Sequence, residues 1–175
     1  MRAIALTGFM GCGKSSVGSI LADLLPGFEW IDLDRFIEET QERTIPELFR
    51  EEGETAFREM EAEALDTIFM INHDLDRNCV LSLGGGTVTH PDSRSLLRQH
   101  ARCIYLRASV DTLVTNLRSE AASRPMLQGG SSLRARIETL MEQREPLYES
   151  IAELTIDIDG KSSNGIAREI RDLLR

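Results

Sequence analysis

Residues 8–15 have the sequence GFMGCGKS, which fits the pattern G-x-x-x-x-G-K-[ST] at every fixed position. The apolar run before them, residues 3–7, predicts a buried strand, and apolar residues recur at helical spacing over residues 17–25. The segment therefore lies between a strand and a helix, which is the context that a phosphate-binding loop requires. A glycine-rich turn with a chance lysine is the weaker alternative, because both flanking elements are in place.

Such a loop binds an anion for a physical reason. Glycines let the backbone curl so that successive N–H groups face one anion, and the following helix presents its positive end to the same anion. We expect Lys14 to reach the β- and γ-phosphates of a nucleotide and the Ser15 hydroxyl to ligate Mg²⁺. The chain is therefore expected to bind a nucleoside triphosphate, with ATP as the first choice.

The composition limits the class of protein. A chain of 175 residues with 41% hydrophobic and 28% charged residues suits one soluble globular domain, here residues 1–175. A formal charge of −9 argues against a nucleic-acid surface, and no apolar run is long enough to span a membrane. Three cysteines without metal-ligand spacing indicate reduced thiols in a cytoplasmic protein.

The rest of the chain alternates strands with helices. Further strands are predicted at residues 29–34, 79–83, 102–106 and 154–158. With helices between and after them, this order predicts an α/β fold, a three-layer sandwich in which a five-stranded parallel sheet is flanked by helices. Residues 44–47 form a capping box at the start of one helix, and Gly53 is its expected stop.

The longest predicted loop spans residues 119–132, where the helical pattern breaks into small, polar and glycine residues. A loop of this length in a compact domain is a candidate mobile lid. It contains Arg124, and an arginine on a closing loop can neutralise the charge that develops on a transferring phosphoryl group.

Three motifs are predicted to meet at one edge of the sheet. The phosphate-binding loop follows the first strand, Asp32 and Asp34 end the second, and Gly84-Gly85-Gly86 follows the third. Ligands of such sheets bind beyond the carboxyl ends of the strands. If the second strand persists, both acids face the same way; one can hold the water shell of Mg²⁺ and the other can accept the proton of an attacking hydroxyl. Two solvated acids are the alternative.

The arginines outside the lid are open to two interpretations. Arg58 lies among acids on a predicted helix, where pairs with Glu54 or Glu61 on a solvated face would explain it. Arg144 lies near a predicted helix end, where it would interact with the helix dipole. Either one could instead clamp a carboxylate or a phosphate.

Taken together, these motifs resemble shikimate kinase across essentially the whole chain. The resemblance is carried by residues 8–15, Asp32-Leu33-Asp34, Phe57-Arg58, Gly84-Gly85-Gly86, Arg124-Pro125 and Arg144-x-Pro146-Leu147-Tyr148. It implies transfer of the γ-phosphate of ATP to the 3-hydroxyl of shikimate, in the biosynthesis of aromatic amino acids. It also implies a core like that of the nucleoside monophosphate kinases, with a closing lid and a substrate-binding helical region over about residues 34–62.

The resemblance also implies a role for each matching residue. The catalytic residues would be Lys14, Asp34 and Arg124. ATP would contact Gly11, Cys12, Gly13, Lys14, Ser15, Ser16, Arg118 and Arg124. Shikimate would contact Asp34, Arg58, Gly84, Gly85, Gly86 and Arg144. Arg58 and Arg144 would bind its carboxylate. Mg²⁺ would be held by Ser15 and, through water, by Asp32.

Other functions fit part of this pattern. A gluconate-type sugar acid is also a polyol with a carboxylate, whereas a nucleoside monophosphate has no clear use for Asp34. A nucleotide-binding module without catalysis is a third possibility, which phosphoryl transfer to an acceptor would exclude. We expect a cytoplasmic monomer whose partners are ATP and shikimate.

Overall fold

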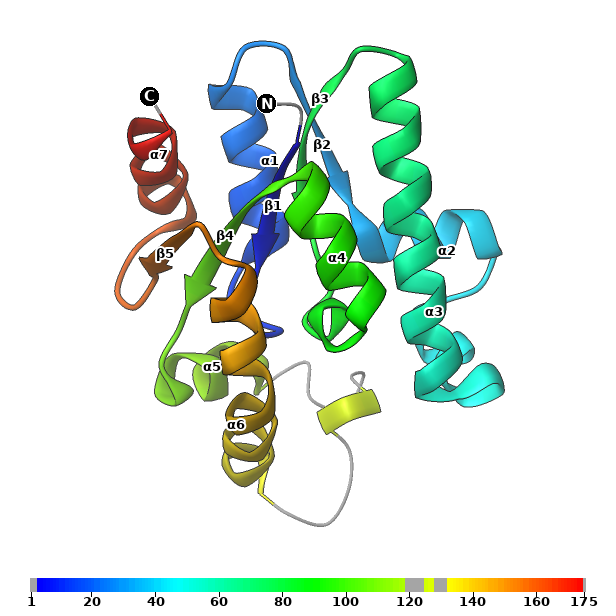
Figure 1. Ribbon diagram of the computed structural model, residues 1–175. Coiled ribbons are helices and arrows are strands. Elements are labelled where there is room, and N and C mark those ends of the chain that lie inside the picture. Colours follow the sequence, from blue (N-terminus) through cyan, green and yellow to red (C-terminus); the bar gives the residue numbers. More distant parts are fainter. Residues whose placement is uncertain (1–2, 119–124, 128–131, 175) are drawn as a thin grey trace.

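The computed structural model describes residues 3–118, 125–127 and 132–174. Its centre is a five-stranded sheet in the order β2-β3-β1-β4-β5, and every neighbouring pair is parallel (Figure 1). The strands are β1 (Ala3–Thr7), β2 (Phe28–Asp32), β3 (Asn78–Ser82), β4 (Arg102–Arg107) and β5 (Leu154–Asp157). The helices are α1 (Lys14–Leu24), α2 (Leu33–Gln41), α3 (Ile45–Asp74), α4 (Pro91–His100), α5 (Val110–Leu117), α6 (Leu133–Ile151) and α7 (Ser163–Leu173), with short 3₁₀ turns η1 (Thr87–Thr89) and η3 (Pro125–Leu127).

Helices cover both faces of the sheet, which confirms the predicted three-layer α/β fold. The two sides of β1 explain how the layers form. Ile4 and Leu6 pack into the cluster under α1 and α7, while Ala3 and Ala5 pack into the cluster under α3 and α4. Alternate residues of a strand point to opposite faces, and a sheet buried on both faces therefore needs a continuous apolar run such as this one.

The second strand ends two residues earlier than the sequence pattern predicts. β2 stops at Asp32, whose Oδ1 accepts a hydrogen bond from the backbone N–H of Arg35 at 3.2 Å and so caps α2. Asp34 therefore lies in the first turn of a helix, and the expectation that Asp32 and Asp34 share one face of a strand is wrong. Both acids nevertheless remain at the carboxyl edge of the sheet.

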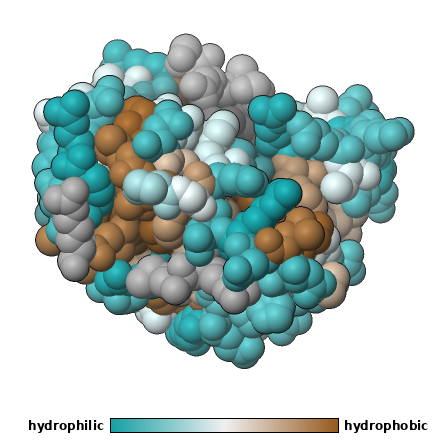
Figure 2. Space-filling model, turned by 90° about the horizontal axis from the view of Figure 1, so that it is seen from above, coloured by the Kyte–Doolittle hydropathy of each residue, from teal (hydrophilic) through white to brown (hydrophobic). Residues whose placement is uncertain are grey.

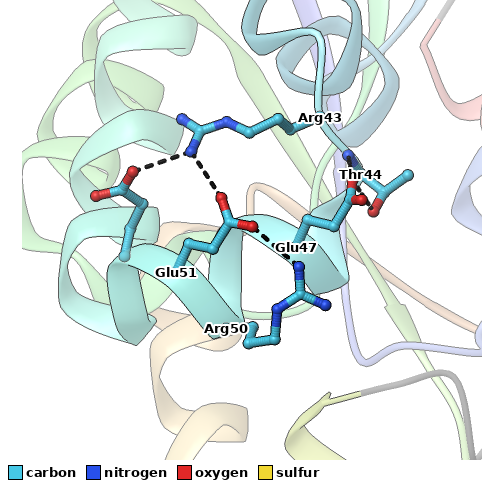
Figure 3. Close-up of polar contacts among 6 residues, drawn as sticks. Arg43, Thr44, Glu47, Arg50 and Glu51 are labelled. Carbon is cyan, nitrogen blue, oxygen red and sulfur yellow. Dashed lines mark hydrogen bonds and ion pairs between the residues drawn. The ribbon is translucent and has the colours of Figure 1, made fainter.

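α3 is bent where a helix stop was predicted. Gly53 has φ 84° and ψ 172°, so residues 45–52 form a separate helical segment before the kink. The capping box at its start is confirmed, since the Glu47 carboxylate accepts from the backbone N–H of Thr44 at 2.8 Å. Arg43 then pairs with Glu51 at 3.2 Å and with Glu52 at 3.0 Å, which ties the turn before α3 to this segment (Figure 3).

The predicted lid lies largely outside the described residues. Of residues 119–132, the structure describes the short turn η3 and Ser132, the residue that caps α6.

Within the described residues, no helix has the length and apolar character needed to cross a membrane. The face at the amino ends of the strands is mostly polar, with apolar groups between the polar ones (Figure 2).

Candidate active site

The phosphate-binding loop connects β1 to α1 at the carboxyl edge of the sheet. Gly11 and Gly13 have φ values of 80° and 85°, which glycine adopts without strain, and α1 begins at Lys14. The Lys14 Nζ donates to the carbonyl oxygens of Gly8 and Phe9 at 2.8 and 2.9 Å. In this arrangement the lysine side chain is curled along its own loop, with its ammonium group close to where an anion would bind.

A cavity of about 350 Å³ opens over this loop. Its walls include the predicted nucleotide residues Gly11, Gly13, Lys14, Ser15 and Ser16. Asn116 of helix α5 also lines it, although no motif in the sequence pointed to this residue. Its Nδ2 donates to the carbonyl of Gly11 at 2.9 Å. The contact joins segments more than a hundred residues apart, which no local pattern could indicate.

Ser15 and Asp32 form a pair of oxygen ligands beside the loop. The Ser15 hydroxyl donates to Asp32 Oδ2 at 2.5 Å, and both residues line the cavity. Hydroxyl and carboxylate oxygens suit Mg²⁺, which takes few ligands from the protein and the rest from water and phosphates. Among the described residues no group of three or more His, Cys, Asp or Glu side chains could cage a metal alone, and a site shared with phosphates does not need one.

A second cavity, of about 250 Å³, adjoins the first. Its polar lining is Asp34, Glu38, Arg58, Glu61 and Arg144, together with Gly84, Gly85 and Gly86. Its apolar lining is Met10, Ile45, Pro46, Phe49, Phe57 and Met126. The two cavities share Met10, Asp34 and Gly85. Asp34 is therefore the one acidic side chain at the boundary between the cavities, among the described residues.

Asp34 has an unusually basic carboxyl group. Its pKa is raised to about 6, first by burial and then by the negative charges of Glu61 and Asp32, while Lys14 and Arg58 act in the opposite direction. A carboxyl with such a pKa takes up a proton more readily than an ordinary aspartate. It is placed to serve as a general base at the wall between the two cavities.

Arg58 is buried at the side of the second cavity, so the solvated-face interpretation is wrong, although both predicted partners are present. Its guanidinium donates to Glu61 at 2.5 Å and to Glu54 at 3.2 Å. Glu61 is fully buried and also accepts from the Thr87 hydroxyl at 2.5 Å. The sequence suggested Glu61 only as a surface partner, but it joins α3 to the turn after the glycines.

Arg144 is buried in the middle of α6, not at its end. The helix continues through Pro146 to Ile151, so the helix-dipole interpretation of this arginine is wrong. Its side chain is 2% exposed and its Nη1 donates to the carbonyl of Gly85 at 3.3 Å. Arg58 and Arg144 thus bring two buried guanidinium groups to one small cavity.

The three glycines are required by space. A Cβ on Gly84 would lie 2.5 Å from Glu61 Oε1, and one on Gly85 would lie 2.8 Å from the backbone nitrogen of Met10. A Cβ on Gly86 would collide with the guanidinium of Arg58. The run is therefore packed against the arginine, its acid partner and the phosphate loop, and is not a free turn.

Similarity to known proteins agrees with this arrangement. The model of the shikimate kinase family matches residues 10–175. The chain belongs to the shikimate kinase family. A shikimate kinase from Geobacter metallireducens is 41% identical over 174 residues, which covers 99% of this chain and 92% of the relative. One from Thermus thermophilus is 40% identical over 171 residues, covering 98% and 89%.

A solved shikimate kinase gives the same result for the fold. The structure of the Acinetobacter baumannii shikimate kinase in complex with shikimate superimposes with a TM-score of 0.90 at 33% identity, covering 99% of this chain and 93% of that one. Shikimate kinases are ATP-using kinases, which agrees with the phosphate loop of this member.

Three predicted site residues are not among the described residues that line the two cavities. Arg124 lies outside the described residues. Arg118 is exposed just after α5. It is not among the described residues that line either cavity. Cys12 is 2% exposed and packs in the core under the loop, where it fills space.

Proposed function

We propose that this protein transfers the γ-phosphoryl group of ATP to the 3-hydroxyl of shikimate, giving shikimate 3-phosphate for the biosynthesis of aromatic amino acids. The observation that carries the proposal is the pair of cavities that meet at Asp34. One cavity has the groups that bind phosphates. The other has two buried guanidinium groups and apolar walls, which suit a small carboxylated ring.

The acceptor site fits an anionic triol. Arg58 and Arg144 would bind the carboxylate, since guanidinium groups bind carboxylates with charge-assisted hydrogen bonds. The rings of Phe49 and Phe57 form an apolar wall, and the Arg58 guanidinium lies over them at 5.6 and 5.4 Å. Asp34, at the opening toward the nucleotide, would accept a hydrogen bond from the hydroxyl that reacts.

The reaction follows from this placement. The 3-hydroxyl oxygen forms a bond to the γ-phosphorus as the bond from that phosphorus to the β,γ-bridging oxygen breaks, and the hydroxyl proton passes to Asp34. Lys14 and the loop N–H groups balance the charge on the phosphates. Mg²⁺, held by Ser15 and through water by Asp32, would neutralise further phosphate charge when bound. ADP then leaves as the second product.

Several parts of the proposal concern the whole chain. We propose a single domain over residues 1–175, acting as a cytoplasmic monomer. Residues 119–132 would be the lid, with Arg124 on the transferring phosphoryl group and Arg118 near the adenine. Residues 34–62 would be the helical region that binds shikimate, which agrees with the lining that α2 and the start of α3 give to the second cavity.

An acceptor assay tests the proposal directly. ADP release would be followed with ATP and Mg²⁺ while shikimate, shikimate methyl ester, gluconate and nucleoside monophosphates are compared. We expect turnover with shikimate and a kcat/KM about 10- to 100-fold lower with the ester, because esterification removes charge-assisted hydrogen bonds to the two arginines. Turnover with a different acceptor, and none with shikimate, would assign that acceptor as the substrate. If no acceptor led to ADP release, the acceptor would be an untested compound or the protein would be a nucleotide-binding module without catalysis.

A further inference from the structure

Tyr148 is a residue of the Arg144-x-Pro146-Leu147-Tyr148 motif that the reaction described above does not use. It lies four residues after Arg144, and residues at this spacing lie on the same side of a helix. Its ring is fully buried, and its hydroxyl donates to the carbonyl oxygen of Gly85 at 2.5 Å. Arg144 donates to the same oxygen at 3.3 Å. One carbonyl thus accepts from two side chains of one helix.

The position of this carbonyl makes the contact relevant to the site. Gly85 lines both cavities, and a Cβ there would press on the backbone of Met10 in the phosphate loop. The peptide that joins Gly85 to Gly86 is trans and planar, so the direction of its carbonyl also sets the direction of the Gly86 N–H, on the opposite side. A group that holds the Gly85 carbonyl therefore sets the orientation of the wall between the cavities.

We propose that Tyr148 is a positioning residue for acceptor binding, acting through Gly85 and Arg144. Its short hydrogen bond satisfies the Gly85 carbonyl, which leaves the Arg144 guanidinium with only a long contact to that oxygen and keeps this side chain in the lining of the second cavity. Without the hydroxyl, the carbonyl would draw the charged arginine to itself, because a buried acceptor is costly to leave unpaired. This inference rests on the proposed function.

The tyrosine can perform this role over a wide pH range. Burial raises the pKa of the Tyr148 hydroxyl well above its ordinary value, so the group remains a protonated donor wherever the enzyme is folded and active. Neighbouring Tyr105 provides a matched comparison. Its ring lies 5.2 Å from that of Tyr148 and is also buried, but its hydroxyl donates to Glu145 at 3.4 Å, and within the described part of the chain no hydrogen bond joins it to the glycine run.

The test compares Tyr148→Phe with Tyr105→Phe, since each variant removes one buried hydroxyl from the same part of the core. We expect Tyr148→Phe to raise the KM for shikimate about tenfold while kcat and the KM for ATP change less than about twofold. Tyr105→Phe should leave all three within about twofold, even if both variants lose similar thermal stability. In the background of Arg144→Ala, Tyr148→Phe should add little, because the arginine through which it acts is gone.

A second measurement does not require a change at Tyr148. The chain has two tyrosines, so Tyr105→Phe leaves Tyr148 as the sole one, and labelling tyrosine with ¹³C at Cζ gives a single resonance in its NMR spectrum. That resonance should shift as shikimate is added, with half-saturation near the KM. A resonance that does not respond to saturating shikimate would overturn the role of Tyr148, even where Tyr148→Phe does not fold.

The outcomes separate the two proposals. No turnover of shikimate by the parent protein would overturn the proposed function, and this inference with it. Normal turnover by the parent with an unchanged KM in Tyr148→Phe, or with equal changes in both tyrosine variants, would overturn the positioning role alone.

Discussion

Asp34 shows how single-residue chemistry emerges from its surroundings. Burial first, and then the negative charges of Glu61 and Asp32, raise the pKa of its carboxyl to about 6 against the opposite effect of Lys14 and Arg58. A base with a pKa close to working pH combines a usable ionised fraction with useful basicity. The environment that costs stability at this residue is thus the one that suits it to accept a proton.

This pKa predicts an acid limb in the pH profile. Asp34 must be ionised to accept the hydroxyl proton, so kcat/KM for shikimate should fall about tenfold per pH unit below a pH of about 6 and level off above it. Steady-state kinetics between pH 4.5 and 8.5, with buffers at about equal ionic strength, would measure the limb. A profile that is flat through pH 6 would contradict the assignment of Asp34 as base.

Asp34→Asn is the control for that limb. It should lower kcat by about 10²- to 10⁴-fold with little change in the KM for ATP, and the residual activity should lack the limb. Equal losses of rate and of ATP binding would contradict the role of Asp34 as base.

The same pKa shift predicts how stability depends on pH. Because the folded-state pKa is raised above 3.8, the folded protein binds the proton more tightly than the unfolded chain, and stability falls as pH rises from about 4 to about 6. Denaturation at several pH values should show this fall in the parent protein relative to Asp34→Asn.

At the scale of elements, α3 connects the second cavity, which would bind the acceptor, to the core. Its first segment, before Gly53, supplies apolar wall, and the segment after it carries Arg58 and Glu61. Glu61 is fully buried and pairs with the arginine and with Thr87 after the glycine run. Because this one carboxylate joins Arg58 on its own helix to Thr87 of η1, the orientation of Arg58 depends on how α3 and the glycine run meet.

Glu61→Gln and Glu54→Gln form a matched pair, since each removes one negative partner of Arg58. Glu61→Gln leaves a buried guanidinium without its main counter-charge and should lower the free energy of unfolding by about 3 kcal/mol. Glu54 is 45% exposed at its side chain, and its replacement should cost less than about 1 kcal/mol. Urea denaturation of both variants would measure the difference.

Kinetics of the same pair check the link to the site. Glu61 raises the pKa of Asp34, so the acid limb should move to lower pH in Glu61→Gln and stay in place in Glu54→Gln. The KM for shikimate should rise in the first variant because Arg58 is no longer held. If the two variants behaved alike, the buried link between α3 and the glycine run would have no functional part.

The sequence predicted the elements well and their ends less well. Periodicity and the phosphate-loop pattern were enough for the sheet and its order of strands and helices. The end of β2 was missed because Asp32 can end a strand or cap a helix, and its hydrogen bond to Arg35 decides for the cap. Arg144 was placed near the end of a predicted helix, yet α6 continues beyond it to Ile151.

Contacts between distant residues were beyond sequence reasoning for a physical reason. The motifs told which residues would meet at the sheet edge, since parallel strands bring their carboxyl ends together. They did not tell that Gly84 and Gly86 must be glycine to admit Glu61 and Arg58, or that Asn116 reaches Gly11. Those facts depend on tertiary packing between elements, which leaves no periodic trace in the chain.

At the scale of the whole molecule, the sheet separates two apolar clusters and carries the site at one edge. β1 lies at its centre, with β3 and β4 on either side and β2 and β5 at the edges. Cys79 on β3 pairs in register with Ala3, and Cys103 on β4 pairs with Ala5. These two thiols therefore lie on either side of the central strand, within the same apolar cluster.

Thiol labelling would test whether this sheet opens as one unit. Cys79 and Cys103 are 0% and 2% exposed, and burial is the main cause that raises their pKa values to about 11 and about 12. A thiol reagent can react only after the strands open, so both should label slowly in native buffer. After correction for their rates in the unfolded chain, the two labelling rates should agree, and both should report the global free energy of unfolding.

Ligand dependence distinguishes global opening from local opening. Shikimate at about 100 times its dissociation constant should slow both labelling reactions about 100-fold, because only the folded state binds it. Mass spectrometry of the labelled peptides would give each rate separately. Since β3 is next to the edge strand β2, local fraying there would instead make Cys79 react faster than Cys103 and without regard to ligand. That result would mean that the β2–β3 edge opens on its own, and that the sheet and its site are not one cooperative unit.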